Sequence, residues 1–296
     1  GVEQRARLWG KKDMYYPHIL VMTATPIPRT LALTLYGDLD VSVIDELPSG
    51  RKEIITSHRF DNSRLKVFNF IKKTVDLGGQ VYVVYPLIEE SAKKDHKDLM
   101  DGYKSLTRYF PETQIGVLHG RMKSENKEYE MKRFADGKSK ILVSTTVIEV
   151  GVDVANASVI IIESAERFGL SQLHQLRGRV GRGSAQSYCI LMTKYDLNND
   201  SKERIKAMVG SSDGFKIANV DLKMRGPGNM MGTKQSGLLE LRFVNLAEDY
   251  NVIKQTRIVA SELIKDDPNL SDQKNKGTKE HLKKSIKSNI NWSRVS

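Results

Sequence analysis

The sequence of 296 residues contains a single cysteine, Cys189, and no long apolar run. One cysteine cannot form an internal disulfide or a cysteine-based zinc site, so we expect a reducing, cytoplasmic environment. No apolar stretch approaches the roughly 18 to 20 residues that cross a bilayer, so we expect no membrane partner. The first residues also carry no apolar signal segment.

The sequence also lacks the short motifs that hold nucleotide phosphates and their metal ion. It has no Gly-x-x-x-x-Gly-Lys-Ser/Thr loop and no Asp-Glu-x-His or similar acidic pair after a strand. No Gly-x-Gly-x-x-Gly follows a strand, which excludes a dehydrogenase-like nucleotide site. No metal site is predicted within this chain.

Positive charge is in excess. The 47 basic and 36 acidic residues leave a formal net charge of +11, which favours a polyanionic partner, most simply nucleic acid. The last stretch, 271–296, holds seven basic and two acidic residues, and we expect part of this basic tail to be mobile.

Apolar, β-branched runs alternate with stretches long enough for helices, which predicts the α/β class with a parallel sheet flanked by helices. Two helices are expected at 62–76 and 124–135 from their apolar spacing. The expected strands are 18–23, 53–59, 80–87, 115–119, 139–145, 158–163 and 186–192.

Proline and glycine at 47–51 interrupt this pattern. We therefore expect residues 1–48 to end one domain and 49–195 to form a complete second one. Residues 196–250 are expected to form a helical hairpin and a glycine-rich loop, and 251–296 a helix and basic tail.

The segment 172–183, QLHQLRGRVGRG, carries the strongest chemical signal. With Ser171 as helix cap, Arg179 and Arg182 would share one helical face. Gly178 and Gly181 would each cost about 1 kcal/mol inside a helix, and close approach to a phosphate or a neighbouring domain would offset that cost. Two guanidiniums suit the charge that develops on a γ-phosphate during hydrolysis. The alternative is an arginine-rich, solvated helix.

Hydroxyl groups follow a second apolar strand. Ser144, Thr145 and Thr146 precede Gly151 and Asp153, and ligands bind at the carboxyl ends of strands in open α/β sheets. The hydroxyls could hold a nucleic-acid phosphate, and Asp153 could order a nucleotide. The alternative is a strand end with capping residues.

Two further strand ends carry polar side chains. Thr23 and Thr25 stand in the segment TATPIP, where two prolines fix an extended turn. His119 and Arg121 follow the strand at 115–119, although a lone histidine is more often structural than catalytic.

Together these four segments resemble motifs III, V and VI of superfamily 2 helicases. The resemblance implies that Gln175, Arg179 and Arg182 contact ATP, and that Gly151 and Asp153 lie beside the nucleotide. It also implies that Thr23 and Thr25 couple the nucleotide cleft to the DNA track, which His119, Arg121 and the hydroxyls at 144–146 would help to form.

The region that contains RGPG at 225–228 and GTKQSG at 232–237 resembles the translocation motif shared by the RecG and Mfd families. These two segments, together with TLYGDLD at 34–40 and DELPSGR at 45–51, resemble RecG more than Mfd. The resemblance implies a RecA-like fold and an ATP-dependent DNA helicase acting on branched DNA in recombination and repair. Arg204, Arg225 and Gln235 match residues that couple ATP turnover to movement on DNA.

The same resemblance places the phosphate loop and the Mg²⁺-binding acidic box before Gly1, in a first motor domain behind a wedge domain. Residues 1–48 would then end the first motor domain, and 49–195 would form the second. Implied partners are branched or duplex DNA, the first motor and wedge domains, and single-stranded-DNA-binding protein, with a monomeric state. The alternatives are a transcription-repair coupling translocase of the Mfd type and a non-catalytic nucleic-acid-binding module.

Overall fold

The computed structural model describes residues 20, 22, 42–44, 46, 50–86, 92–145, 154–225 and 249–288. The chain divides into two compact units, one made of 25–27 and 42–224 and the other of 1–24, 28–41 and 225–296. In the described part of the chain, no helix is both long and apolar enough to cross a membrane.

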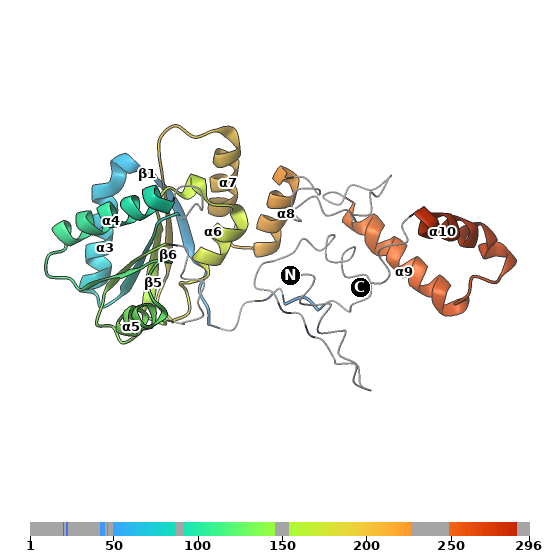
Figure 1. Ribbon diagram of the computed structural model, residues 1–296, viewed down its shortest axis with the longest axis horizontal. Coiled ribbons are helices and arrows are strands. Elements are labelled where there is room, and N and C mark those ends of the chain that lie inside the picture. The colour runs from blue at the N-terminus through green and yellow to red at the C-terminus, as the bar shows by residue number, and fades with distance from the viewer. Residues whose placement is uncertain are drawn as a thin grey trace. The chain divides into compact units, whose positions relative to one another are not determined.

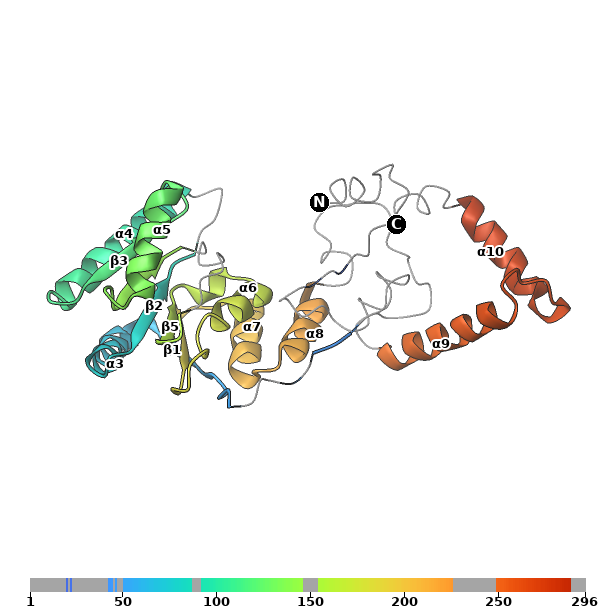
Figure 2. The ribbon, with the colours of Figure 1, turned by 90° about the horizontal axis from the view of Figure 1, so that it is seen from below.

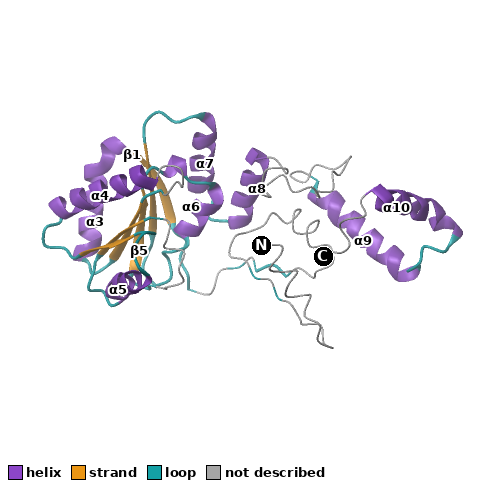
Figure 3. Ribbon diagram, in the orientation of Figure 1, coloured by secondary structure: helices purple, strands orange, loops and turns teal. Residues whose placement is uncertain are grey.

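The larger unit is built on a six-stranded sheet (Figures 1 and 3). Every pairing is parallel and the strand order is β1-β6-β5-β2-β4-β3, which confirms the predicted fold class. The strands are β1 (Ile55–Phe60), β2 (Gln80–Val84), β3 (Ile115–Leu118), β4 (Ile141–Ser144), β5 (Ala157–Ile162) and β6 (Tyr188–Thr193).

Helices cover both faces of this sheet (Figure 2). They are α3 (Arg64–Asp76), α4 (Ala92–Tyr109), α5 (Ser124–Ala135), α6 (Leu170–Arg177) and α7 (Asn199–Gly210), with short 3-10 turns η1 (Asp61–Ser63) and η4 (Ala165–Arg167). Helix α8 (Gly214–Arg225) follows α7 and contributes Ile217 to the core of this unit.

Alternate residues of each strand enter opposite cores, because side chains of a strand point to opposite faces. In β2, Val81 and Val83 pack with α3 and α4, whereas Tyr82 and Val84 belong to the core that holds residues of α5, α6 and α7. Both faces are therefore apolar, which explains the continuous apolar runs of the sequence.

Two apolar residues of these helices lie outside the core. Leu65 in α3 is 67% exposed, whereas Val67 of the same helix is buried. Tyr129 in α5 is also exposed, while Met131 and Phe134 pack in the core.

The smaller unit contains α9 (Tyr250–Asp266), the 3-10 turn η5 (Gln273–Asn275) and α10 (Lys276–Ser288). Asp267 ends α9 and organises the connection, since its carboxylate accepts hydrogen bonds from the backbone N–H of Ser271 and Asp272 and from Asn275 Nδ2. These bonds hold the pKa of Asp267 below its usual value. The structure thus gives an ordered α9–α10 connection where the sequence predicted a helix and a basic tail.

Candidate nucleotide and DNA site

The arginine-rich segment leaves its helix earlier than the sequence suggested. Helix α6 has Gly169 as its N-cap and ends at Arg177, with Gly178 as C-cap. Ser171 therefore lies in the first turn, and Arg179 and Arg182 lie beyond the helix. The prediction that they share a helical face was wrong, because the chain turns out of the helix at Gly178.

Two glycines of this segment are required by packing within this domain. Gly181 has φ +80°, and a Cβ built on it would lie 2.9 Å from Ile54 Cγ1. A Cβ on Gly183 would lie 2.6 Å from the carbonyl oxygen of Ala155. The close neighbour of Gly181 is thus a residue of this domain, a Cβ on Gly178 would meet only ordinary contacts, and approach of this segment to a phosphate or a neighbouring domain stays a prediction.

The two candidate finger residues differ in their surroundings. Arg179 is partly exposed, and its side chain has no hydrogen-bond or ion-pair partner within the described residues. Arg182 is exposed, and its Nε lies 3.4 Å from the carbonyl oxygen of Gly178, a marginal hydrogen bond. Gln175, on the last full turn of α6, is partly exposed as well. The turn thus presents one polar and two cationic side chains.

Arg177, which sequence reasoning did not single out, is the buried member of this segment at 3% exposure. Its guanidinium donates to the carbonyl oxygens of Met208, Ser211 and Ser212 at the end of α7. It also donates to Nδ1 of His174, whose pKa falls to about 4 because of burial and the neighbouring Arg177 charge. The sequence places three arginines within residues 177–182, but no local pattern distinguishes the buried Arg177 from the two more exposed arginines.

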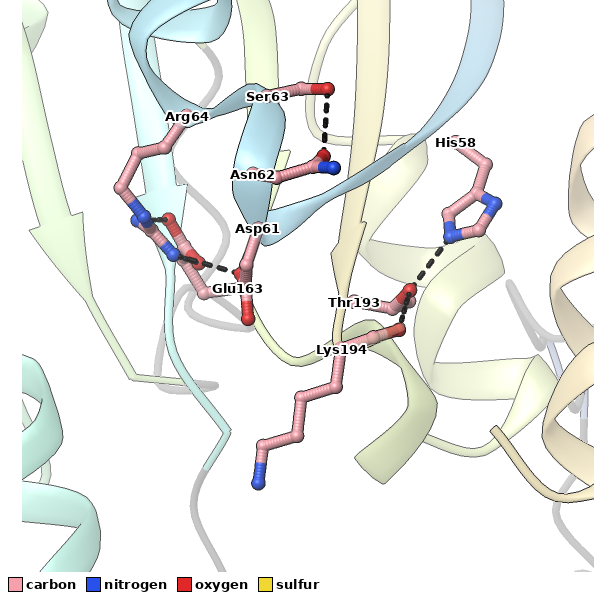
Figure 4. Close-up of polar contacts among 8 residues, drawn as sticks. All are labelled: His58, Asp61, Asn62, Ser63, Arg64, Glu163, Thr193 and Lys194. Carbon is pink, nitrogen blue, oxygen red and sulfur yellow. Dashed lines mark hydrogen bonds and ion pairs between the residues drawn. The ribbon is translucent and has the colours of Figure 1, made fainter. Parts of the chain in front are cut away.

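Polar groups gather at the carboxyl ends of the neighbouring parallel strands β1, β6 and β5 (Figure 4). Arg64 Nη1 and Nη2 lie 2.6 and 2.9 Å from the two carboxylate oxygens of Glu163, and Nη2 is 3.1 Å from Asp61. Burial, followed by the Glu163 charge, raises the pKa of nearby Tyr85. The next residue after Glu163, Ser164, has a left-handed φ of +48°.

The ends of β3 and β4 adjoin one another. The backbone N–H of Thr145 donates to the carbonyl oxygen of Leu118, one residue before His119. The hydroxyls of Ser144 and Thr145 are buried and have no hydrogen-bond partner in the described part of the chain. Arg121 is exposed on the turn that follows His119. The structure thus places these four candidate residues at one edge, and their contact with DNA stays a prediction.

The remaining candidates are only partly described. Thr23, Thr25, Thr146, Gly151, Asp153 and Gln235 lie outside the described residues, and for Arg225 the structure gives only its place at the end of α8. Arg204 is described, and its guanidinium donates to the carbonyl oxygens of Glu166 and Phe168, just before α6. Among the described residues, no group of three or more His, Cys, Asp or Glu could hold a metal ion.

Two family models and several relatives match most of this chain. The helicase conserved C-terminal domain matches residues 64–184, and the family described as ATP-dependent DNA helicase RecG, domain 3, C-terminal, matches residues 211–296. An ATP-dependent DNA helicase RecG of Synechocystis is 54% identical over 271 residues, which cover 91% of this chain and 32% of that protein.

The RecG protein of Aquifex aeolicus is 49% identical over 277 residues, covering 92% of this chain and 35% of its own length. A solved structure of RecG bound to a three-way DNA junction is 46% identical, has a TM-score of 0.65, and is matched over 81% of this chain and 31% of that one. The chain spans about a third of the length of the curated relatives it matches. It belongs to the RecG family of ATP-dependent DNA helicases.

Proposed function

We propose that this chain supplies the second motor domain and the translocation motif of an ATP-dependent DNA helicase that acts on branched DNA. Family membership supports this, and so does the solved relative, which is bound to a three-way junction. The observation that carries the proposal is the turn after α6, where Arg179 has no side-chain partner among the described residues and Arg182 is exposed.

Arg179 and Arg182 fit a triphosphate better than they fit a structural role. A guanidinium is always charged and presents a planar set of donors that matches phosphate oxygens. When ATP and Mg²⁺ are bound, hydrolysis builds charge on the transferred phosphoryl group, which a finger arginine stabilises. We propose that Arg179 and Arg182 stabilise that charge and that Gln175 contacts ATP beside them. Gly151 and Asp153 would lie beside the nucleotide.

The phosphate loop and the Mg²⁺ ligands would be contributed by a first motor domain, of which residues 1–48 would form the end. Thr23, Thr25, Arg225 and Gln235 would pass relative motion of the two motor domains to the DNA. His119, Arg121 and the hydroxyls of residues 144–146 would line the DNA track. Translocation would then push the branch point against a wedge domain of the same polypeptide.

Other parts of the proposal concern organisation. Residues 49–195 would form the second motor domain, 196–250 the translocation motif, and 251–296 a C-terminal helix and basic tail. The free, buried thiol of Cys189 is in keeping with a reducing cytoplasm, where we propose that the protein works. We also propose that it is a monomer and that single-stranded-DNA-binding protein is a further partner.

The test is strand separation by the full-length helicase that carries this chain. A three-way junction with one labelled strand should be unwound in the presence of ATP and Mg²⁺, and ATP turnover should rise when the junction is added. The chain alone should turn over almost no ATP. Robust turnover by the chain alone, or no response of the full-length protein to the junction, would contradict the proposal.

A further inference from the structure

Two arginines cross between α6 and α7 in opposite directions. Arg177, the last residue of α6, reaches the end of α7, and Arg204, within α7, reaches the turn before α6. The Arg177 guanidinium is bound mainly to carbonyl oxygens at and just after the end of α7, and the Arg204 guanidinium to carbonyl oxygens just before α6. We call these two sets of hydrogen bonds the reciprocal arginine clamp.

The Arg177 end of the clamp uses the four N–H bonds of its two terminal nitrogens. Nη1 donates to the carbonyl oxygens of Met208 at 3.0 Å and Ser211 at 2.7 Å, and it lies 3.4 Å from Thr56 Oγ1 of β1, a marginal hydrogen bond. Nη2 donates to the carbonyl oxygen of Ser212 at 3.1 Å and to His174 Nδ1, also at 3.1 Å. The last carbonyls of a helix lack intrahelical partners, so a cation placed there satisfies acceptors of α7 and of the link to α8 together.

The Arg204 end fixes the other side of α6. Its Nη1 donates to the carbonyl oxygen of Phe168 at 2.6 Å. Its Nη2 donates to the carbonyl oxygen of Glu166 at 3.1 Å and to the hydroxyl oxygen of Ser201 at 3.0 Å. Phe168 and Glu166 belong to the turn η4 and its end, directly before the helix. Both ends of α6 are thus bound to α7.

Stability alone does not require this arrangement. Leu173 and Leu176 of α6 already share an apolar core with Ile205 and Met208 of α7, and such packing holds two helices together without a buried charge. Burying a charged group is costly, and apolar replacements are often neutral or stabilising. Hydrogen bonds from a rigid guanidinium add direction, because they fix how α6 and the link to α8 are oriented.

We propose that Arg177 is a positioning residue that makes α6, α7 and the start of α8 move as one body, so that displacement of the Arg179 turn is passed to the translocation motif. This inference rests on the proposed function. Arg179 follows Arg177 by two residues, and Ser212 precedes α8 by two, so the Arg177 bond to the Ser212 carbonyl oxygen directly links the segment before the Arg179 turn to the start of α8. Arg177 touches neither nucleotide nor DNA in this scheme.

The test compares Arg177→Met with Phe134→Leu in the full-length helicase. The first removes the donors but keeps apolar volume, and the second weakens the same core at fully buried Phe134, on α5 rather than in the clamp. Two quantities are measured on a three-way junction: the maximal rate of ATP turnover and the number of base pairs separated per ATP hydrolysed.

Arg177→Met should retain ATP turnover within about threefold of the wild type while base pairs separated per ATP fall by about tenfold. Phe134→Leu should leave that ratio unchanged. Equal loss of turnover and strand separation in Arg177→Met, or an unchanged ratio, would overturn the inference. A wild type that fails to respond to the junction would instead contradict the proposed function.

Hydrogen exchange on the chain itself keeps the inference testable if Arg177→Met folds poorly in the longer protein. In Arg177→Lys, which keeps the charge but not the planar set of donors, amides of α7 and α8 should exchange about tenfold faster while those of β2 and β5 stay protected. Unchanged exchange in α7 and α8 would show that the clamp does not hold them, and the inference would be wrong.

Discussion

Gly181→Ala should destabilise the domain, whereas Gly178→Ala, three residues earlier in the same segment, should not. Gly181 has φ +80°, a region that costs an alanine about 1 to 2 kcal/mol. The added Cβ would also lie 2.9 Å from Ile54 Cγ1 and 3.1 Å from its Cδ1, an overlap that costs about 1 to 3 kcal/mol. The expected loss in free energy of unfolding is therefore about 2 to 5 kcal/mol.

Gly178 provides the matched control. Its φ of −68° suits any residue, and an added Cβ would meet carbonyl oxygens only at 3.4 and 3.6 Å, an ordinary contact. Loss of glycine's freedom in the unfolded chain should leave the protein unchanged or more stable by about 0.4 to 1 kcal/mol. Urea unfolding of this chain, followed by circular dichroism, measures both variants.

The double variant Gly181→Ala, Ile54→Ala separates the two costs. Removing the Ile54 side chain abolishes the overlap but not the backbone strain, so the pair should show a coupling of about 1 to 3 kcal/mol. If Gly181→Ala unfolded at the wild-type urea concentration, or Gly178→Ala were the more damaging of the two, the packing described for this turn would be wrong.

Three further predictions follow from buried groups. The pKa of His174 is about 4 in the folded chain, below the ordinary 6.5, so the unfolded chain binds the proton first as pH falls. Between pH 6.5 and pH 4 the free energy of unfolding should therefore fall by up to about 1.4 kcal/mol per pH unit, relative to that of His174→Gln. Parallel profiles of unfolding free energy against pH for the two proteins would contradict this. Burial raises the pKa of the Cys189 thiol to about 12 and leaves it 0% exposed, so iodoacetamide should modify it only after unfolding, and rapid modification of the native chain would count against the fold. Glu163→Gln removes the charge that pairs with Arg64, which is partly exposed, so a loss of about 1 to 2 kcal/mol is expected in urea unfolding, and wild-type stability would show that the pair contributes nothing.

The sheet could be predicted from sequence because its strands are apolar on both faces. The runs expected at 80–87 and 158–163 correspond to β2 and β5, and no end is shifted by more than three residues. A strand that is buried on both faces is a continuous run of apolar residues. Such a run can be recognised in the sequence without knowing which strands lie beside it in the sheet. The strand order, by contrast, comes from contacts between distant segments and was not predicted.

The candidate site was predicted by motif rather than by geometry. The residue types of 172–183 pointed to Arg179 and Arg182, but their shared helical face was inferred from spacing alone and was wrong. The turn that follows α6 brings Gly181 against Ile54, and these residues are 127 positions apart in the sequence. The roles of Arg177 and of the Arg64–Glu163 pair also depend on such distant contacts, which no local pattern reports.

The central claim is that Arg179 faces a triphosphate. Its most direct test is the rate of ATP turnover by the full-length helicase bearing Arg179→Ala, with a three-way junction present and Arg108→Ala, an exposed arginine of α4, as control. The expected result is a fall in maximal turnover of about a thousandfold, with junction affinity kept and Arg108→Ala unaffected. Turnover at the wild-type rate in Arg179→Ala would contradict the claim.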